Sequence, residues 1–456
     1  MKEQYSDGIF CVGPQYGFLP CFAPLERLCS TYAPVQRVID LLPVELTKIP
    51  GKMEEAIASM ANLDEVCKAE EDKATLAALF RAYTFLCSGY LLAPAHFNKD
   101  AAGNYGKAHR LLPKQIAQPL VTVSAKLDVY PFLDYHYAYS LGNYVRINPA
   151  GNLHWNNLKM ACSFTGSSDE VGFIMNHVYI EEKSPDLLRG IFDAFNDKAG
   201  GLELVYETIK EMNDRRRTMW TASNHKNYNS FRAFIMGIQG NEEIFGEGVV
   251  YEGCGPEARQ YRGQTGAQDD VIPTLDIFTG VIGHYPDNML TKYLLDLRQY
   301  RPKCVQAFFQ DLEAEAPGLL ARIDARGDHE SLITLLRIVE QIYYFRNGHW
   351  QFVQKYIMAN TKYAKATGGT PIISWIPNQI DAVLKYMSVL VEKIGSRGAT
   401  NEHFKKVVEG LGEKNKLLDM QLEELKSIDY NVERIFKFNE TVGQRFNLDD
   451  TKVDKF

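Results

Sequence analysis

The sequence predicts a mainly α-helical fold with a small N-terminal domain of mixed or helical structure over residues 1–150, a large all-α domain over 151–395 and a helical extension over 396–456. Three observations support this prediction. A chain of 456 residues is long enough for two or three domains of about 150 residues, although one large helical domain is also allowed. Beyond residue 150, apolar residues recur mainly at helical spacing. The turn-forming run NPAGNLHWN at 148–156 separates the two larger parts.

The composition is that of a globular protein and excludes several function classes. Hydrophobic residues make up 45% of the chain and charged residues 23%, which is ordinary for such proteins. There are 50 Lys and Arg against 57 Asp and Glu, so the net charge is −7. Without a long basic run, this charge argues against nonspecific binding to nucleic acid or to anionic membranes. No run of about 18 apolar residues and no secretory signal is present, so we expect a cytoplasmic protein without a membrane-spanning helix.

The N-terminal residues predict short elements around one helical region. Six prolines within residues 1–50 indicate irregular structure and short helices. Residues 52–92 are predicted to be helical because apolar residues, among them Leu76, Leu79 and Tyr83, repeat at three-to-four spacing. A loop and an apolar, aromatic segment follow, and they lead to the turn-forming run.

The large domain is predicted to consist of helices joined by loops. Its apolar residues follow helical periodicity rather than strand alternation over residues 186–213, 226–238, 287–312, 331–358 and 376–394.

The C-terminal extension, residues 396–456, is rich in charge and carries a narrow apolar stripe, which predicts an amphipathic helix. Such a helix packs either on the body of its own chain or on another chain. We expect a monomer, with a homodimer formed through this extension as the alternative. The stripe consists of Val408, Leu411, Leu418, Leu422, Leu425, Val432 and Ile435.

Common metal-binding motifs are missing from the sequence. Eight cysteines are scattered singly and form no C-x-x-C pair, which argues against a zinc ribbon, a thioredoxin-like site or an iron–sulfur cluster. The ten histidines are also dispersed, without an H-E-x-x-H motif. Dispersed thiols fit a reducing compartment.

The predicted helix at 331–358 carries a histidine on its apolar face. His349 lies at helical spacing from Ile342, Phe345 and Val353. It is either a core histidine satisfied by a neighbour or an axial ligand to haem iron, which requires a neutral imidazole on a dry helix face. In the second case Arg346, one turn earlier, would reach a haem propionate or an acid that orients it. The pattern alone leaves both interpretations open.

A second candidate lies in YNSFRAFIMGIQG at 228–240, where Tyr228 and Arg232 are one helical turn apart. Its neighbours Phe231 and Phe234 make this segment too apolar for a freely solvated face. A partly buried guanidinium requires a carboxylate from the protein or from a ligand. A surface arginine is the alternative.

Glycine-containing segments offer weaker signals. The stretch 246–266 is Gly-rich, and GQTGAQ at 263–268 and TGGT at 367–370 match neither the dinucleotide fingerprint nor a P-loop. These mismatches argue against nucleotide binding. Both short loops are candidates for flexible lids whose backbone approaches a ligand closely.

Several motifs occur along the chain in an order that resembles the indoleamine 2,3-dioxygenase family. Shorter matches, GFLP at 17–20 and LLPKQIAQPL at 111–120, lie upstream. The similarity covers residues 10–395 and is most specific from 225 to 370, so the C-terminal extension lies outside it. The main motifs are VYEG at 250–253, RGQTGAQ at 262–268, LLDLRQYRP at 294–302, RNGH at 346–349 and AKATGGT at 364–370.

The resemblance implies a haem b cofactor, active with ferrous iron, and O₂ as co-substrate. His349 takes the position of the proximal haem ligand, and the small domain would cover the opposite, distal side. Arg346 resembles a family arginine that contacts an acidic residue and a propionate, and its implied acidic partner is Asp276 in VIPTLDIF.

The resemblance also implies a substrate pocket. Arg232 takes the position of the arginine that clamps the substrate carboxylate, and Tyr228 that of an aromatic packed on the indole ring. Phe173 matches an aromatic wall, and Thr367 matches a threonine in the mobile loop that closes over bound tryptophan. The remaining pocket positions are Tyr135, Ala138 and Tyr139, together with Gly263, Gln264, Thr265 and Gly266 of the distal loop.

His177 is the main departure from the family pattern, since it falls where the animal enzymes have a serine. The related tryptophan 2,3-dioxygenases keep a distal histidine that binds the indole N–H, and His177 would restore that contact. The alternative is a short alignment slip that leaves His177 outside the pocket. Asn227 and Tyr228 likewise replace a doubled aromatic. We expect Arg232, His177 and Thr367 to act in catalysis.

The leading expectation is therefore a haem-dependent dioxygenase of the kynurenine pathway, which converts L-tryptophan to N-formylkynurenine. A first alternative is a related haem protein that oxidises or rearranges a modified tryptophan or indole in secondary metabolism. A second is a non-enzymatic O₂-binding haem protein, and a third is a haem-free structural protein. Retention of Arg232 and Thr367 argues against an oxygen carrier, which needs no carboxylate clamp.

Overall fold

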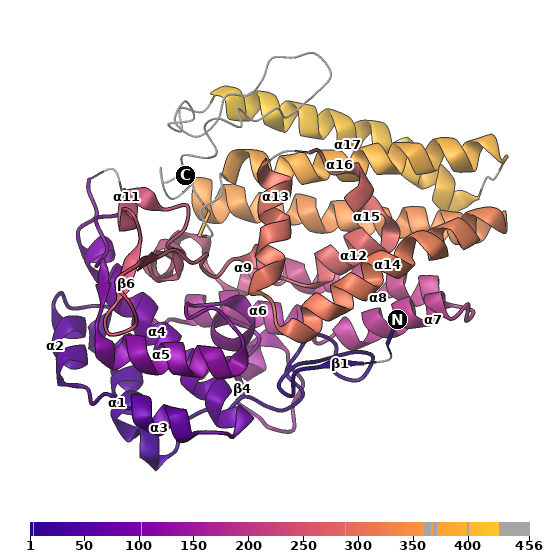
Figure 1. Cartoon of the computed structure of the whole chain (residues 1–456). Helices are drawn as coiled ribbons and strands as arrows, with labels where there is room; N and C mark the ends of the chain where they lie inside the picture. Colours follow the sequence, from indigo (N-terminus) through magenta and orange to yellow (C-terminus); the bar gives the residue numbers. More distant parts are fainter. Residues whose placement is uncertain are drawn as a thin grey trace.

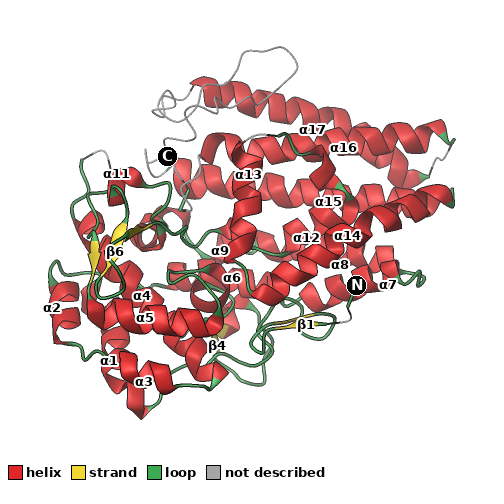
Figure 2. Ribbon diagram, in the orientation of Figure 1, coloured by secondary structure: helices red, strands yellow, loops and turns green. Residues whose placement is uncertain are grey.

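The computed structural model describes residues 1–2, 4–101, 103–287, 289–327, 329–359, 366–367, 372–398 and 401–427. Helices dominate these residues and the strands are only two or three residues long (Figure 1 and Figure 2). The predicted mainly α-helical fold is confirmed.

The N-terminal part begins with an antiparallel strand pair, β1 (Tyr5–Ser6) and β2 (Cys11–Val12). Five helices follow, so the helical periodicity predicted over 52–92 corresponds to three separate helices. They are α1 (Ala33–Leu41), α2 (Lys52–Ser59), α3 (Asp64–Ala69), α4 (Lys73–Phe97) and α5 (Lys114–Leu127). Short 3₁₀ or π turns are η1 (Ser30–Tyr32), η2 (Leu42–Leu46) and η3 (Tyr135–Tyr139).

Helix α4 forms the core of this part. Asp72 caps its start by accepting a hydrogen bond of 2.8 Å from the backbone N–H of Thr75. The helix is long and apolar enough to span a membrane, but most of its apolar stretch is buried inside the protein. Its buried Arg81 donates to the backbone carbonyls of Gly142 and Leu25. Arg81 also interrupts the apolar run, which explains why the sequence criterion did not select this segment.

The turn-forming run at 148–156 connects two paired strands. Strand β4 (Tyr144–Arg146) is antiparallel to β5 (Leu158–Met160), and a short turn, η4 (Trp155–Asn157), precedes β5. The proposed boundary at residue 150 therefore falls within a hairpin. The division of the chain into domains remains a prediction.

The Gly-rich stretch contains strands that the sequence analysis did not predict. Strand β6 (Val249–Tyr251) pairs in parallel with β3 (Leu111–Leu112) and antiparallel with β7 (Ala258–Arg259). Gly248, with φ of +121°, stands at the entrance to β6, where a backbone that L-residues rarely adopt favours glycine. This small sheet joins the N-terminal part to the segment before the predicted distal loop.

The rest of the chain folds into helices close to the predicted segments. The segment 331–358 forms α15 and a π turn, as its periodicity predicts. The helices are α6 (Ser168–Glu181), α7 (Ser184–Phe195), α8 (Gly201–Arg217), α9 (Met219–Ala222), α10 (Asn229–Arg232), α11 (Glu242–Phe245), α12 (Val271–Thr279), α13 (Met289–Asp296), α14 (Lys303–Ala325), α15 (His329–Phe352) and α16 (Ile372–Ser396). The 3₁₀ or π turns are η5 (His225–Asn227), η6 (Ala233–Ile235), η7 (Gly266–Gln268), η8 (Val281–His284), η9 (Leu297–Tyr300) and η10 (Val353–Met358).

The predicted helix at 226–238 is wrong in length. Only α10 is α-helical there, between the 3₁₀ turns η5 and η6, and the backbone becomes extended at Met236. The following Gly237 packs directly against the backbone of Gly263, where a Cβ would meet the amide nitrogen of Gly263 at 2.2 Å. This close approach of two chain segments ends the helix.

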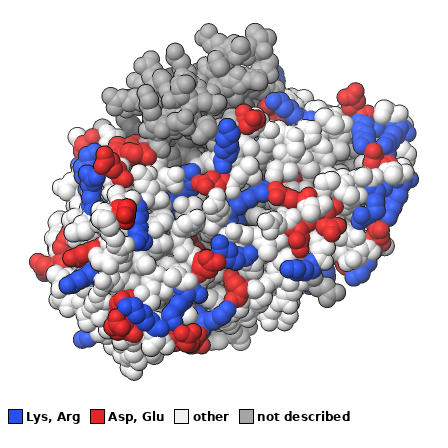
Figure 3. All heavy atoms as spheres, in the orientation of Figure 1, with Lys and Arg blue, Asp and Glu red and all other residues white. Residues whose placement is uncertain are grey.

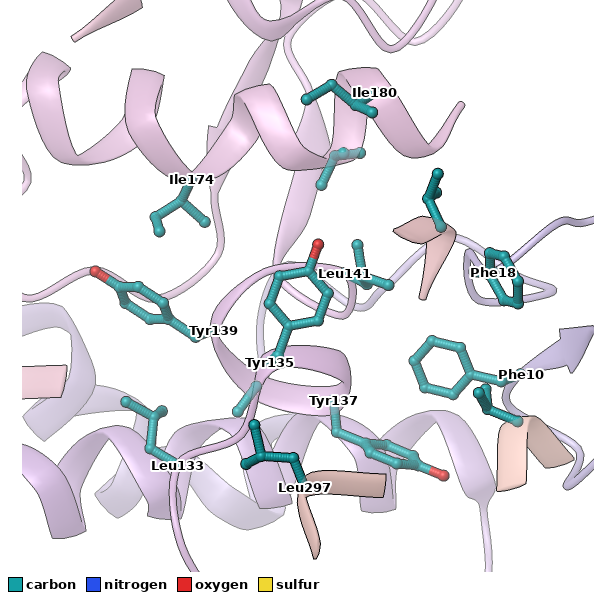
Figure 4. Packing of buried hydrophobic residues seen from close by; sticks show 14 of the residues in the cluster. Phe10, Phe18, Leu133, Tyr135, Tyr137, Tyr139, Leu141, Ile174, Ile180 and Leu297 are labelled. Atoms are coloured by element: carbon teal, nitrogen blue, oxygen red, sulfur yellow. The ribbon is translucent and has the colours of Figure 1, made fainter. Parts of the chain in front are cut away.

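The aromatic segment before β4 packs into the core. Asp134 caps η3 by accepting hydrogen bonds from the backbone N–H groups of Tyr137 and Ala138. From this turn the rings of Tyr135, Tyr137 and Tyr139 point in different directions (Figure 4). The ring of Tyr137 lies edge-on to Phe10, with centroids 4.9 Å apart. The turn thus ties the N-terminal strands to the core.

The extension begins with α17 (Glu402–Ser427), which packs on α16 and α15 at the top of Figure 1. Leu418 and Leu422 of the predicted stripe are buried, whereas Val408 is exposed and its neighbour Val407 is buried instead. Lys414 forms an ion pair of 2.9 Å with Glu340 of α15. This helix therefore covers the body of its own chain. Side chains of Leu425, Val432 and Ile435 lie outside the described residues.

Charged side chains of both signs are interspersed on the face shown in Figure 3. Elsewhere in the described chain, exposed ion pairs such as Arg27–Asp40 and Lys159–Glu26 have distances of 2.6 Å.

Candidate functional site

A cavity of about 240 Å³ opens between helices α6, α12 and α15. Its wall is mostly apolar and aromatic, with a small number of charged groups, as is typical of cofactor and ligand sites. Ten of the predicted site residues lie on this wall: Phe173, His177, Tyr228, Gln264, Thr265, Gly266, Asp276, Arg346, His349 and Thr367.

His349 faces the cavity from α15. His349 keeps accessible surface, and its side chain lines this cavity, which lies inside the protein. Burial in the protein lowers the pKa of its ring to about 4, with smaller contributions from Arg216 and His177. The imidazole is therefore neutral at neutral pH. Within the described residues its ring has no hydrogen-bond partner, so a core histidine satisfied by a neighbour does not describe it.

Arg346 and Asp276 meet on the wall although 70 residues separate them in the chain. Nη2 of Arg346 lies 2.5 Å from Oδ2 of Asp276 and donates to the hydroxyl of Tyr285 at 2.6 Å. Nη1 donates to the backbone carbonyl of Gln379 at 3.1 Å. Tyr285 in turn donates to Asp276, at 2.5 Å. The structure brings together the predicted pair and adds a tyrosine that the sequence analysis did not identify.

His177 lies on the same wall, one turn after Phe173 on α6. Its Nδ1 is 3.1 Å from the backbone carbonyl oxygen of Phe173, so Nδ1 carries a proton and donates to that oxygen. Burial lowers the pKa of the ring, which leaves Nε2 as a hydrogen-bond acceptor. Of the two alternatives for this residue, the structure supports the one that places it at the cavity.

Aromatic rings form one side of the cavity. The ring centroids of Phe173 and Tyr228 are 4.8 Å apart, and Tyr356 lies within 5.8 Å of both. The hydroxyl of Tyr356 donates to the backbone carbonyl of Ser223 at 2.5 Å, which fixes its ring in the wall. Tyr356 belongs to the apolar stripe of α15 and η10. Its position on the same stripe as His349 is the sequence signal that could have identified it as a pocket residue.

Thr367 joins the distal loop in the structure. Its Oγ1 donates to the backbone carbonyl of Gln264 at 2.8 Å, and its own carbonyl accepts from the backbone N–H of Gly237 at 2.7 Å. Residues 368–370 of TGGT lie outside the described residues. The two glycine-containing loops, nearly 100 residues apart in sequence, thus meet at the cavity.

Five predicted site residues are buried behind the wall and do not line it: Tyr135, Ala138, Tyr139, Arg232 and Gly263. Tyr135 packs edge-on against His177, with ring centroids 5.8 Å apart, and Tyr139 donates to Glu170 at 3.5 Å. Arg232 has no exposed surface, and its backbone N–H donates to the carbonyl of Tyr228 at 3.1 Å. Their predicted pocket roles remain predictions.

A group of buried carboxyls next to the cavity was not predicted. Burial raises the pKa of Glu181 well above its usual range, with further increases from Asp269 and Asp270. Burial also raises the pKa of Asp269 to about 6. Asp270 is instead held ionised by His136 at 2.8 Å and Arg301 at 2.7 Å. The sequence signal that could have pointed to this group is the pair Asp269–Asp270, which directly follows GQTGAQ.

Replacing Glu181 by Gln is expected to make unfolding less sensitive to pH. The folded-state pKa of Glu181 lies above its unfolded value of 4.5. The folded protein therefore keeps this proton at pH values at which the unfolded chain has already released it. The parent therefore loses stability as pH rises through the folded pKa, at up to about 1.4 kcal/mol per pH unit relative to Glu181→Gln. Denaturant unfolding at a series of pH values above 4.5 measures this difference. The exposed control Glu257→Gln should keep the parent's slope, and an equal slope in both variants would contradict the prediction.

The donor set of the wall suits a cofactor held by a single imidazole better than a metal ion held by several side chains. Among the described residues, no group of three or more His, Cys, Asp or Glu side chains could hold a metal ion. A single neutral imidazole, His349, instead faces an apolar cavity. On the same wall, Nε of Arg346 and Oδ1 of Asp276 are buried without a hydrogen-bond partner in the described part of the chain.

Comparison with known proteins shows which family this chain resembles. The family model described as indoleamine 2,3-dioxygenase matches residues 7–410. The chain is 26% identical over 379 residues to indoleamine 2,3-dioxygenase 2 of Mus musculus, covering 81% of this chain and 89% of that relative. It is also 26% identical over 375 residues to indoleamine 2,3-dioxygenase of Saccharomyces cerevisiae, covering 76% and 79%. For indoleamine 2,3-dioxygenase acdA of Aspergillus candidus, 26% identity extends over 418 residues, covering 82% and 95%.

Proposed function

The chain belongs to the indoleamine 2,3-dioxygenase family, and from this premise we propose that it is a haem-dependent dioxygenase acting on L-tryptophan. The reaction adds both atoms of O₂ across the indole C2–C3 bond and gives N-formylkynurenine, the first intermediate of the kynurenine pathway. The observation that carries the proposal is the neutral imidazole of His349 facing an apolar cavity.

The residues on the wall fit a haem group. A neutral imidazole is the axial ligand that ferrous haem takes in many proteins, and the rings of Phe345 and Phe352 offer apolar surface on the same side of α15. Haem propionates require cations at the rim. Arg346 supplies one, with an Nε that has no protein partner within the described residues and a position fixed by Asp276. When bound, haem would supply the O₂ chemistry, and the protein would supply binding and orientation.

The aromatic wall would position the indole. Phe173 and Tyr228 present rings that pack on an aromatic substrate and exclude water. Holding the reactants in contact is the main catalytic contribution expected of these residues, and effective molarities of about 10⁵ M or more are known for well-oriented groups.

Polar groups around the aromatic wall would hold the amino-acid part of the substrate. Arg232 is the proposed carboxylate clamp, one helical turn after Tyr228, and a planar guanidinium suits a bidentate carboxylate contact. The ammonium group would lie near Thr367, whose position is fixed by its bond to Gln264. No protein general base is required in this scheme.

His177 would accept a hydrogen bond from the indole N–H, because Phe173 holds its Nδ1 and leaves Nε2 free to accept. Replacing His177 by Leu is expected to weaken binding of L-tryptophan about tenfold. It should leave binding of 1-methyltryptophan, which lacks this N–H, nearly unchanged. Ligand-induced changes in the absorption spectrum of the haem-loaded protein measure both affinities. An equal loss for the two ligands would contradict this role.

A second candidate function is oxidation or rearrangement of a modified tryptophan or indole in secondary metabolism. The observation in its favour is His177 on the cavity wall, because an added polar group changes which indoles the pocket accepts. For either function we propose a cytoplasmic monomer acting on a small molecule.

Turnover with a panel of indoles separates these functions. The haem-loaded, reduced protein is mixed with L-tryptophan or substituted indoles, O₂ is admitted, and products are identified by mass spectrometry. Formation of N-formylkynurenine from L-tryptophan supports the leading function. Conversion of a substituted indole alone would support the second, and O₂ binding without any product would contradict both.

A further inference from the structure

Arg216 is a buried cation on the side of the cavity that carries His349. It lies near the end of α8 and lines the cavity, with only 7% of its surface exposed. Its guanidinium carbon is 5.7 Å from the ring centroid of Phe345 and 5.5 Å from that of Phe352. These two aromatics lie four residues before and three residues after His349. Arg216 therefore occupies the same face of α15 as the histidine.

Gly348 makes this position possible. A Cβ at residue 348 would meet Nη1 of Arg216 at 1.9 Å and its Cζ at 2.2 Å. Any other residue at 348 would therefore displace the guanidinium. Glycine in the middle of a helix lowers stability by roughly 0.5–1 kcal/mol relative to alanine. The space that Gly348 leaves for Arg216 explains why glycine occupies this position in α15.

The other arginines on the cavity wall have carboxylate partners. Arg298 pairs with Glu313 at 2.5 Å, Arg301 with Asp270 at 2.7 Å and Arg346 with Asp276 at 2.5 Å. Across the described residues Arg216 has no such partner. Its Nη2 donates to the backbone carbonyl of Tyr344 at 3.3 Å, and its Nε has no acceptor.

A charge in this environment requires an anion. Burial lowers the pKa of Arg216 to about 10, so the group is still positively charged at neutral pH. Buried charges in proteins are normally paired, because leaving one unpaired is costly. No protein carboxylate of the described residues reaches Arg216, and a carboxylate on a molecule in the cavity would supply the missing partner.

We propose that Arg216 is an anion site of this cavity, which binds a carboxylate group of the molecule held beside His349. The site is separate from the Arg346–Asp276 pair and from Arg232. The carboxylate comes either from the prosthetic group or from the amino-acid substrate, and the identity of both rests on the proposed function. Planar guanidinium groups bind carboxylates through two parallel N–H donors, and Nε of Arg216 has no acceptor among the described residues.

The test compares Arg216→Gln with Arg217→Gln. Arg217 is the neighbouring, exposed arginine and pairs with Asp214 at 2.7 Å, so it serves as the matched control. Two quantities are measured on each haem-loaded protein. One is the rate of haem transfer to an excess of apomyoglobin. The other is the affinity for L-tryptophan and for tryptamine, which lacks the carboxylate, taken from the change in the haem absorption spectrum.

Faster haem transfer from Arg216→Gln, by about tenfold or more, with unchanged tryptophan affinity, identifies the prosthetic group as the source of the carboxylate. Unchanged haem transfer with tryptophan binding weakened about tenfold and tryptamine binding unaffected identifies the substrate. Haem transfer and affinities equal to those of the parent would overturn the proposal. Equal weakening of tryptophan and tryptamine, without faster haem transfer, would also overturn it.

Two further variants separate this site from a folding defect. Arg216→Lys keeps the charge and should retain part of the lost binding. Gly348→Ala favours the helix but displaces the guanidinium, so it should fold stably and show the same loss as Arg216→Gln. Normal binding by Gly348→Ala would contradict the proposal. Failure of the parent to bind haem would instead refute the proposed function, so the two failures are distinguishable.

Discussion

His349→Ala is expected to fold and to lose haem. The neutral ring of His349 faces the cavity from α15 and has no hydrogen-bond partner among the described residues. Its removal therefore leaves the packing of the helix nearly intact and deletes the proposed axial ligand. The absorption spectrum after reconstitution with haem should lack the Soret band of a histidine-ligated haem protein, and dioxygenase activity should fall to background.

Two controls make this result specific. His403→Ala removes an exposed histidine on α17 and should keep the spectrum of the parent. Added imidazole should restore a Soret band to His349→Ala, because the free ligand can occupy the space left by the side chain. A normal haem spectrum for His349→Ala without imidazole would show that another residue holds the iron.

Asp276→Asn is expected to destabilise the protein by about 3–5 kcal/mol, because it leaves the buried guanidinium of Arg346 without a counter-charge. The hydroxyl of Tyr285 would remain as a hydrogen-bond partner but carries no charge. Denaturant unfolding of the haem-free proteins measures the effect without a contribution from the cofactor.

The exposed pair Arg27–Asp40 provides the matched control. Asp40→Asn removes a carboxylate from an ion pair of similar geometry that solvent screens, so its effect should stay within about 1 kcal/mol. Similar losses of unfolding free energy for Asp276→Asn and Asp40→Asn would show that burial does not strengthen the Arg346–Asp276 pair. Stability equal to the parent for Asp276→Asn would show that Arg346 is satisfied by other groups.

The sequence correctly predicts those helices whose apolar residues recur at helical spacing within a single segment. The stripe through Ile342, Phe345, His349 and Val353 predicts a long helix with a histidine on its apolar face, and α15 has both features. Periodicity succeeds here because a helix places every third or fourth residue on one face, whatever the rest of the chain does.

Prediction failed where distant segments determine the local structure. The segment 226–238 was predicted as one helix, but the contact between Gly237 and Gly263 ends it early. No strand was identified in the Gly-rich stretch, but β6 forms there by pairing with β3, more than 130 residues earlier. Neither contact leaves a periodic signal within its own segment.

The same contrast between local patterns and contacts of distant segments applies to the candidate site. The pairing of Arg346 with Asp276 was implied by the family resemblance, since no local pattern connects residues 70 positions apart. Arg216 and Gly348 were not predicted, because an arginine at the end of one helix and a glycine within another acquire meaning only once α8 packs on α15. Tyr285 was missed for the same reason.

The central claim is that this protein inserts both atoms of one O₂ molecule into an indole ring. The most direct test supplies the haem-loaded, reduced protein with L-tryptophan under a mixture of ¹⁶O₂ and ¹⁸O₂ and analyses the product by mass spectrometry, immediately after a single turnover. Our account predicts N-formylkynurenine carrying either two heavy oxygen atoms or none. Product with one heavy oxygen as the main species would contradict insertion from a single O₂ molecule, and so would label introduced from H₂¹⁸O.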